Sequence, residues 1–202
     1  MARKILISFI TVLLLSPSKL ILAQETQQPA INVKTNPFAS MLSMIPLSAE
    51  VFVLPNVSAS ANVFIVNSKN GESETYFDQN GFGISPEFRY YFTENNINGH
   101  KNRVYAGLLY NYEEGTNTTL DRLDMPIPGW SHAMGGALLI GNQWFFKNHF
   151  TFDVFLGPAY MNYVKNKDFD TNLSKGGFFL SMLGPKASGT RIKFGFNIGI
   201  AF

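Results

Sequence analysis

The sequence contains no cysteine. A disulfide framework is therefore excluded, as is the acylated cysteine by which a lipoprotein is anchored. Charged residues are also few: Asp, Glu, Lys and Arg account for 15% of the chain, whereas a soluble domain carries about 25%. The longest apolar run, residues 5–15, is shorter than the roughly 20 residues of a membrane-spanning helix. These absences leave a fold held by its own hydrogen bonds, with part of its surface suited to a solvent other than water.

The first 23 residues have the layout of a secretory signal peptide. Arg3 and Lys4 precede the apolar run, and a polar break at residues 16–19 leads to Ala23, near which we expect cleavage. Residues 24–202 would then form one domain. The leader contains 3 basic residues and no acidic ones, so the mature chain has 13 basic against 14 acidic residues. Such a nearly neutral chain lacks the concentrated basic surface of a nucleic-acid-binding protein.

The final segment of the chain has the clearest pattern. From residue 191 to residue 202, every even position is large and apolar, and every odd position is small, polar or charged. Successive side chains of a strand point to opposite faces, so this strand has one bulky apolar face and one polar face. That combination is typical of a transmembrane β-barrel with a polar lumen. A water-soluble barrel with the bulky face inward would show the same alternation.

The same alternation recurs upstream and predicts eight strands. In the strand at 81–93, Pro86 should cause a local irregularity, because proline donates no ladder hydrogen bond. An even number of antiparallel strands can close into a barrel with both ends on one side. We therefore predict an all-β fold, an eight-stranded antiparallel transmembrane β-barrel with up-and-down meander order. The predicted strands are 31–41, 47–55, 57–67, 81–93, 103–114, 132–146, 150–164 and 191–202.

Connection lengths agree with this topology, since outer-membrane barrels alternate short periplasmic turns with longer outer loops. Short connections are expected at 55–56 and 147–149, with a somewhat longer one at 94–102. The long polar connections, at 68–80, 115–131 and 165–190, would face outward, and only the outward connection at 43–46 is short.

Aromatic residues, which favour membrane interfaces, gather at both ends of the predicted strands. The periplasmic end would hold Tyr90, Phe92, Trp144, Phe146, Phe150 and Phe202, and the outer end Tyr110, Tyr112, Tyr160 and Tyr163.

Eight charged residues are predicted to face the lumen. Eight strands leave an interior just wide enough for side chains, and an unpaired buried charge is strongly destabilising. We therefore expect these charges to form a network of ion pairs that leaves no open pore. They are Lys34, Glu50, Glu87, Arg89, Glu113, Asp153, Arg191 and Lys193.

Few residues suggest catalysis or metal binding. Ser131, His132 and Asp124 lie near one another in sequence at the predicted outer rim, but nearness in sequence is not the geometry of a catalytic triad. His100 and His149 fall in predicted periplasmic turns, far from His132, so one zinc site shared by all three is rejected. We expect no catalytic residue, metal or cofactor.

Several short segments carry a resemblance to a known family. They are VKTNP at 33–37, SAE at 48–50, PEFRYYF at 86–92, GNQW at 141–144 and the terminal Phe202. In these segments the chain resembles small outer-membrane β-barrel proteins, in particular an uncharacterised family of Gram-negative bacteria known by a domain-of-unknown-function label. The resemblance implies an architecture similar to OmpA and OmpX, without transferable catalytic residues. It also implies that Phe202 is an assembly signal read by the barrel-assembly machinery.

Three interpretations of function remain open at this point. The first is a non-enzymatic outer-membrane barrel, surrounded by lipid, with a structural or surface-interaction role for loops such as 115–131 and 165–190. The second is an outer-membrane lipid-modifying enzyme that uses His132 with a nearby serine. The third is a soluble, lipocalin-like periplasmic barrel, which would turn Phe194 and Phe196 inward around an apolar ligand.

Overall fold

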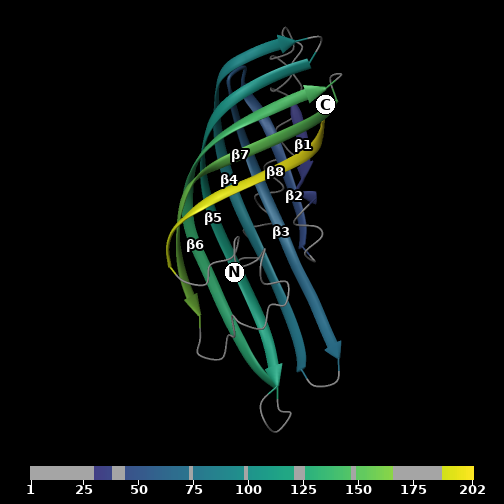
Figure 1. Ribbon diagram of the computed structural model, residues 1–202, viewed down its shortest axis with the longest axis vertical. Coiled ribbons are helices and arrows are strands. Elements are labelled where there is room, and N and C mark those ends of the chain that lie inside the picture. The colour runs from purple at the N-terminus through teal and green to yellow at the C-terminus, as the bar shows by residue number, and fades with distance from the viewer. Residues whose placement is uncertain are drawn as a thin grey trace.

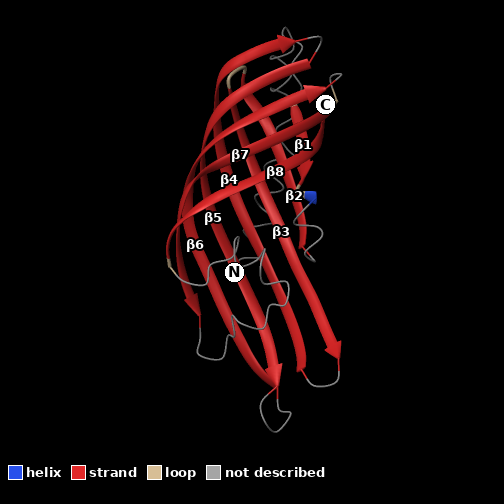
Figure 2. Ribbon diagram, in the orientation of Figure 1, coloured by secondary structure: helices blue, strands red, loops and turns tan. Residues whose placement is uncertain are grey.

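The chain folds into eight β-strands. The computed structural model describes residues 30–37, 44–72, 75–97, 100–120, 126–146, 149–165 and 188–202, so the predicted leader lies outside the described residues. Nearly all of the described chain is strand (Figure 2). No helix in these ranges is long and apolar enough to span a membrane. The strands are β1 (Ile31–Thr35), β2 (Met44–Leu54), β3 (Val57–Glu72), β4 (Thr75–Ile97), β5 (His100–Leu120), β6 (Pro126–Phe146), β7 (Phe150–Lys165) and β8 (Gly189–Ala201).

Each strand pairs with the next one in sequence, and β8 pairs back with β1, so the sheet closes on itself (Figure 1). At this seam Asn32 lies opposite Ala201, and the amide of Phe202 donates a hydrogen bond to the carbonyl of Ile31 at 2.8 Å. The predicted all-β, eight-stranded antiparallel meander is confirmed. Closure satisfies the backbone groups that an open sheet would leave unpaired at its edges.

The strands are strongly staggered around the barrel. Following cross-strand partners once around the sheet from Ala201 leads back to β8 at Arg191, a stagger of ten residues between positions 201 and 191. With a rise of about 3.3 Å per residue and about 4.8 Å between strands, this stagger gives a strand tilt of roughly 40°. The row passes through Asn32, Glu50, Ser60, Glu87, Leu109, Ala137 and Ala159.

Several strands are longer than their sequence pattern indicates. The predicted connection at 43–46 is wrong, because Met44 to Pro46 belong to β2 and pair with residues 64–66 of β3. The described residues of the predicted connection at 68–80 are also strand, since β3 and β4 stay paired out to Glu72 and Thr75. Most of 115–131 likewise belongs to β5 and β6. Ladder hydrogen bonds come from the backbone, so they continue where apolar alternation has stopped.

These long strands make the two ends of the barrel unequal. At the end of the barrel that carries the short turns, β4 reaches Ile97 and β5 begins at His100. The connection between them is therefore shorter than the predicted range 94–102. At the opposite end β3, β4, β5 and β6 extend past their neighbours (Figure 1). The described part of the last outward connection is Ser188; residues 166–187 lie outside the described ranges.

Pro86 interrupts one ladder, as predicted. On the β3 side the pairing runs without a shift, with Pro86 opposite Ala61. On the β5 side the pairing stops after Ile84 opposite Tyr112 and resumes in the same register at Glu87 opposite Leu109. The proline therefore produces a local gap in pairing and no change of register.

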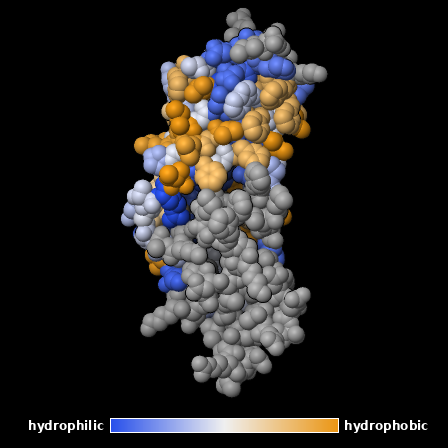
Figure 3. All heavy atoms as spheres, in the orientation of Figure 1, coloured by the Kyte–Doolittle hydropathy of each residue, from blue (hydrophilic) through white to orange (hydrophobic). Residues whose placement is uncertain are grey.

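The apolar face of the sheet points outward and the polar face points inward, which is the reverse of a water-soluble barrel. Inward positions include charged residues such as Arg89, which is 1% exposed, whereas the outward Ile192 is 68% exposed. On the face that Figure 3 shows, apolar residues cover much of the described upper part of the barrel wall, and hydrophilic residues lie toward the turn end. Phe194 is likewise exposed while Lys193 points inward, which contradicts the lipocalin-like orientation. The exposed apolar face includes Ile31, Leu47, Ile65, Phe88, Leu108, Leu138, Leu156 and Ile192, one from each strand.

Candidate functional site in the barrel interior

Strand alternation places the charged residues inside the barrel. On β4, Glu87, Arg89 and Tyr91 are buried, and the intervening Phe88 and Tyr90 are exposed. Alternation with the same two-residue period places Glu50 of β2 and Asp153 of β7 on the inward face. The polar faces of the eight strands therefore line one narrow interior.

Five of the eight predicted lumen charges meet in one network. The Lys34 ammonium lies 2.9 Å from Glu50 and 3.3 Å from Asp153. The Arg89 guanidinium lies 2.8 Å from Asp153 and 2.7 Å from Glu87, with Glu50 at 3.8 Å. Each of these side chains is at most 2% exposed. Two cations thus bridge three carboxylates across β1, β2, β4 and β7.

Neutral polar groups complete the network around each carboxylate. Glu50 accepts hydrogen bonds from the hydroxyls of Ser58 and Tyr91, both at 2.6 Å, and from the amide of Gln143 at 3.0 Å. The Tyr105 hydroxyl donates to Asp153 at 2.9 Å, and the Tyr105 ring lies 4.2 Å from the Arg89 guanidinium. Buried charge is tolerated when its hydrogen-bonding capacity is met, and here partners surround the carboxylates on several sides.

Tyr105 and Gln143 are members of the network that the sequence-based prediction missed. Both are fully buried. The alternation of the strands could have identified them, because both lie on the inward face. Gln143 follows the inward Gly141 by two residues, and Tyr105 follows the inward Arg103 by two. A side chain added at Gly141 would overlap the Tyr105 ring, so the glycine makes room for that ring in the crowded interior.

Apolar layers flank the charged network on both sides. Toward the short turns, Phe52, Tyr91, Tyr105 and Phe145 form one buried cluster with Ala201. Further inside, a second cluster is formed by Leu109, Ala137, Leu139 and Ala159, with Phe155 packed against both clusters. Arg103 lies over the Tyr91 ring at 4.2 Å and donates to the carbonyl of Pro55. Side chains therefore fill the lumen around the network.

The other three predicted charges lie apart from this network, in the outer half of the barrel. Glu113 is half-buried and accepts a hydrogen bond of 2.5 Å from the amide of Asn111. Arg191 and Lys193 occupy two successive inward positions of β8 and are also half-buried. All eight residues occupy the inward phase of their strands, and five of them share ion pairs in the described part of the chain.

Ser131 and His132, the two described residues among those considered for catalysis, do not form a reactive arrangement. Ser131 is buried on the inner face of β6, whereas the adjacent His132 lies on the other face, where its ring stacks on Trp130 with centroids 5.8 Å apart. The two side chains therefore point to opposite sides of the sheet, which excludes this serine as the partner of His132. Asp124 lies outside the described residues.

The three histidines occupy opposite ends of the barrel. His100 begins β5 and packs on Phe146, with ring centroids 5.2 Å apart, and His149 lies in the turn before β7. His132 lies in the outer half of β6, opposite Glu114 of β5. Within the described ranges, no group of three His, Cys, Asp or Glu residues is arranged to hold a metal ion.

Most of the predicted rim aromatics lie on the outer face. Tyr90, Phe92 and Phe150 are about half exposed at the turn end, and Phe202 is 69% exposed. Tyr160 is exposed toward the other end. Tyr163 is an exception, since it shares the inward phase of Ala159 and Met161 on β7.

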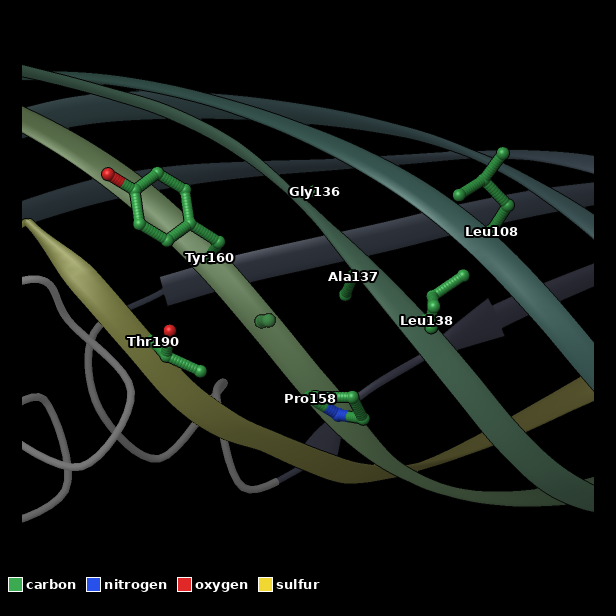
Figure 4. A pocket seen from close by; sticks show the side chains of 8 residues that line it. Leu108, Gly136, Ala137, Leu138, Pro158, Tyr160 and Thr190 are labelled. Atoms are coloured by element: carbon green, nitrogen blue, oxygen red, sulfur yellow. The ribbon is translucent and has the colours of Figure 1, made fainter.

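A shallow pocket lies on the outer wall of the barrel (Figure 4). Its floor includes Gly136 and Ala137, and its sides include Leu108, Leu138 and Tyr160, each more than half exposed. The lining is almost entirely apolar, and no cluster of titratable groups converges on it. This pocket is therefore part of the apolar outer face and has no features of a catalytic cleft.

The fold and interior define a class of protein: a closed eight-stranded antiparallel barrel with an exposed apolar wall and a buried network of charges. The chain belongs to the family described as "Protein of unknown function (DUF3575)", whose model matches residues 9–181. No curated protein matches the chain. A solved structure, the N-terminal β-barrel domain of OprF from Pseudomonas aeruginosa, is similar with 12% sequence identity and a TM-score of 0.48. The similarity covers 87% of this chain and 98% of that one.

Proposed function

We propose that the chain is a non-enzymatic protein of the Gram-negative outer membrane with a structural or surface-interaction role. The observation that carries this proposal is the placement of apolar and charged residues. Large apolar side chains such as Leu138, 63% exposed, cover the outside, while Glu50 and Asp153 are fully buried. In water this arrangement would be unfavourable, since apolar area exposed to water is destabilising by about 25 cal/mol per Å². In a bilayer the same wall faces lipid.

The height of the apolar wall supports the same proposal. On β8 the outward positions from Ile192 to Phe202 are apolar throughout. Ten residue steps of about 3.3 Å, tilted by roughly 40°, rise about 25 Å along the barrel axis. That height equals the roughly 25 Å apolar band of outer-membrane barrels. Beyond it, the paired ends of β3, β4, β5 and β6 would stand outside the membrane as a surface for contacts.

Localisation and solubility test this proposal directly. Expressed with residues 1–202 in a Gram-negative host, the chain is expected to lose about 23 residues and to fractionate with the outer membrane. The purified protein should need detergent to remain dispersed and should migrate faster on a gel before boiling than after it, because a folded barrel is compact. Recovery of the processed chain in the soluble periplasmic fraction would contradict the proposal.

Phe202 supplies a matched variant for that experiment. Its backbone closes the seam with Ile31, but its side chain is 69% exposed and contributes little to packing. We propose that this side chain is recognised by the barrel-assembly machinery. Phe202→Ala should therefore reduce the amount in the outer membrane several-fold while the refolded variant keeps wild-type stability in detergent. Equal reductions in assembly and in refolded stability would assign Phe202 a structural role instead.

We further propose that the lumen is closed. The support is that the buried Lys34–Glu50–Arg89–Asp153 network and its flanking apolar clusters occupy the interior at their level of the barrel. In planar bilayers the purified barrel is expected to insert without a sustained conductance step. Stable channels of uniform conductance at neutral pH would show that the network does not block the passage of ions.

A further inference from the structure

Arg191 and Lys193 differ from the other cations inside the barrel. Both side chains point inward from β8, as the alternating burial of residues 189–194 indicates. Lys34 and Arg89 are 1% exposed, whereas Arg191 and Lys193 keep intermediate exposure. The two β8 cations are therefore less buried than Lys34 and Arg89, and they lie in the outer half of the lumen.

Among the described residues, neither of these cations has an ion-pair partner. Lys34 and Arg89 each contact two or more carboxylates within 4.0 Å. In the described part of the chain, Arg191 and Lys193 have no carboxylate within that distance. Glu113, the nearest acidic residue at this level of the lumen, is engaged by Asn111. In the described part of the chain, the carboxylates whose charges act on Lys193 are those of Glu113 and Glu87, and neither lies within ion-pair distance.

The wall beside these cations is made of small residues. Lys193 lies opposite Gly157 on β7, and Arg191 lies opposite Ala159. The next partner along that row is Ala137 of β6. None of these three positions carries a side chain larger than a methyl group, and the two cations are two residues apart on one face of β8.

We propose that Arg191 and Lys193 form a binding site for a small soluble oxyanion of the phosphate or carboxylate type. A guanidinium presents a planar fork of donors to two oxygens, and a neighbouring ammonium adds a compact charge, which is a favourable combination for an oxyanion. The anion would enter from the outer end and stop at the closed charged network, so the site is a blind vestibule and not a channel. Because the site faces the interior, a lipid headgroup at the outer wall does not reach it.

Titration of the folded, full mature barrel with inorganic phosphate tests this inference. Binding is followed by calorimetry at constant ionic strength, in whichever medium, detergent or buffer, keeps the chain folded. The wild type should give saturable binding, and Arg191→Gln and Lys193→Gln should each weaken it by about tenfold or more, the loss expected for one charge-assisted hydrogen bond. Lys101→Gln is the matched control, because it removes a cation at the turn end of the barrel.

Glu113→Gln gives a variant with the opposite expected sign. It keeps both cations and removes the carboxylate that competes with the anion, so phosphate should bind roughly threefold more tightly or better. This variant decides the question alone if either cation variant fails to fold. Equal affinity for phosphate in the wild type and in the β8 variants, or unchanged affinity in Glu113→Gln, would overturn the inference. Because binding is read from folded barrel in any medium, its failure is separate from failure of the proposed membrane location.

Discussion

Replacing Arg89 by methionine is expected to lower the free energy of unfolding by about 3–5 kcal/mol. Arg89 lies 2.8 Å from Asp153 and 2.7 Å from Glu87, and all three side chains are nearly inaccessible to solvent. Methionine has similar length but no charge, so Lys34 would remain paired with Glu50 and Asp153, while Glu87 would lose its ion pair with Arg89. The large effect comes from uncompensated buried carboxylates, and not from the intrinsic strength of an ion pair.

Urea unfolding in lipid vesicles, followed by the fluorescence of Trp130 and Trp144, measures this effect. The matched control is Lys101→Met, which breaks a 3.4 Å pair with Glu94 whose side chains are 21% and 37% exposed. That change should alter stability by less than about 1 kcal/mol, because solvent already screens the pair. A loss for Arg89→Met no larger than for Lys101→Met would mean that the interior charges do not depend on one another for compensation.

Replacing Leu156 by arginine is expected to destabilise the barrel in a bilayer by about 2–4 kcal/mol. Leu156 points outward from β7 and is 51% exposed. It lies six residues from Phe150 at the turn end, well inside the apolar band. An arginine there would have to be accommodated near the bilayer midplane, where its charge is poorly solvated. In water the same exposed position would accept arginine with little change.

Val164→Arg is the matched control on the same face of the same strand. Val164 is 39% exposed and lies one residue before the outer end of β7. At or beyond the interface, arginine should change stability by about 0–1 kcal/mol. The free energies of unfolding of the two variants in vesicles therefore report how deeply each position lies in the membrane. Equal effects at Leu156 and Val164 would argue against a membrane around this wall.

The charged interior illustrates how much of the site can be predicted from the sequence. Lys34, Glu50 and Asp153 are recognisable as lumen residues because each lies in the polar phase of an alternating segment. The contacts between them are not recognisable in this way. Sequence alternation equally allows Arg191 and Lys193 as partners of those carboxylates, but the structure places both at another level of the barrel.

The positions of the outer strand ends could not be predicted from the sequence, for a related reason. Alternation of apolar and polar residues reflects two different surroundings on the two faces of a strand. At the outer ends of β3, β4, β5 and β6 that contrast weakens, so the sequence there resembles a polar loop. The backbone ladder nevertheless continues, as the pairing of Lys69 with Asp78 and of Thr116 with Trp130 shows.

By itself the sequence determines the strand number and the face on which each side chain lies, because a period of two is a local property of the chain. Only the tertiary structure decides which charges meet. Lys34 and Asp153 are 119 residues apart, yet they come within 3.3 Å because β8 closes against β1 with a stagger of ten residues, from 201 to 191. That closure is a property of the whole ring, and it places Arg89 between Asp153 and Glu87 while leaving Arg191 and Lys193 without carboxylate partners among the described residues.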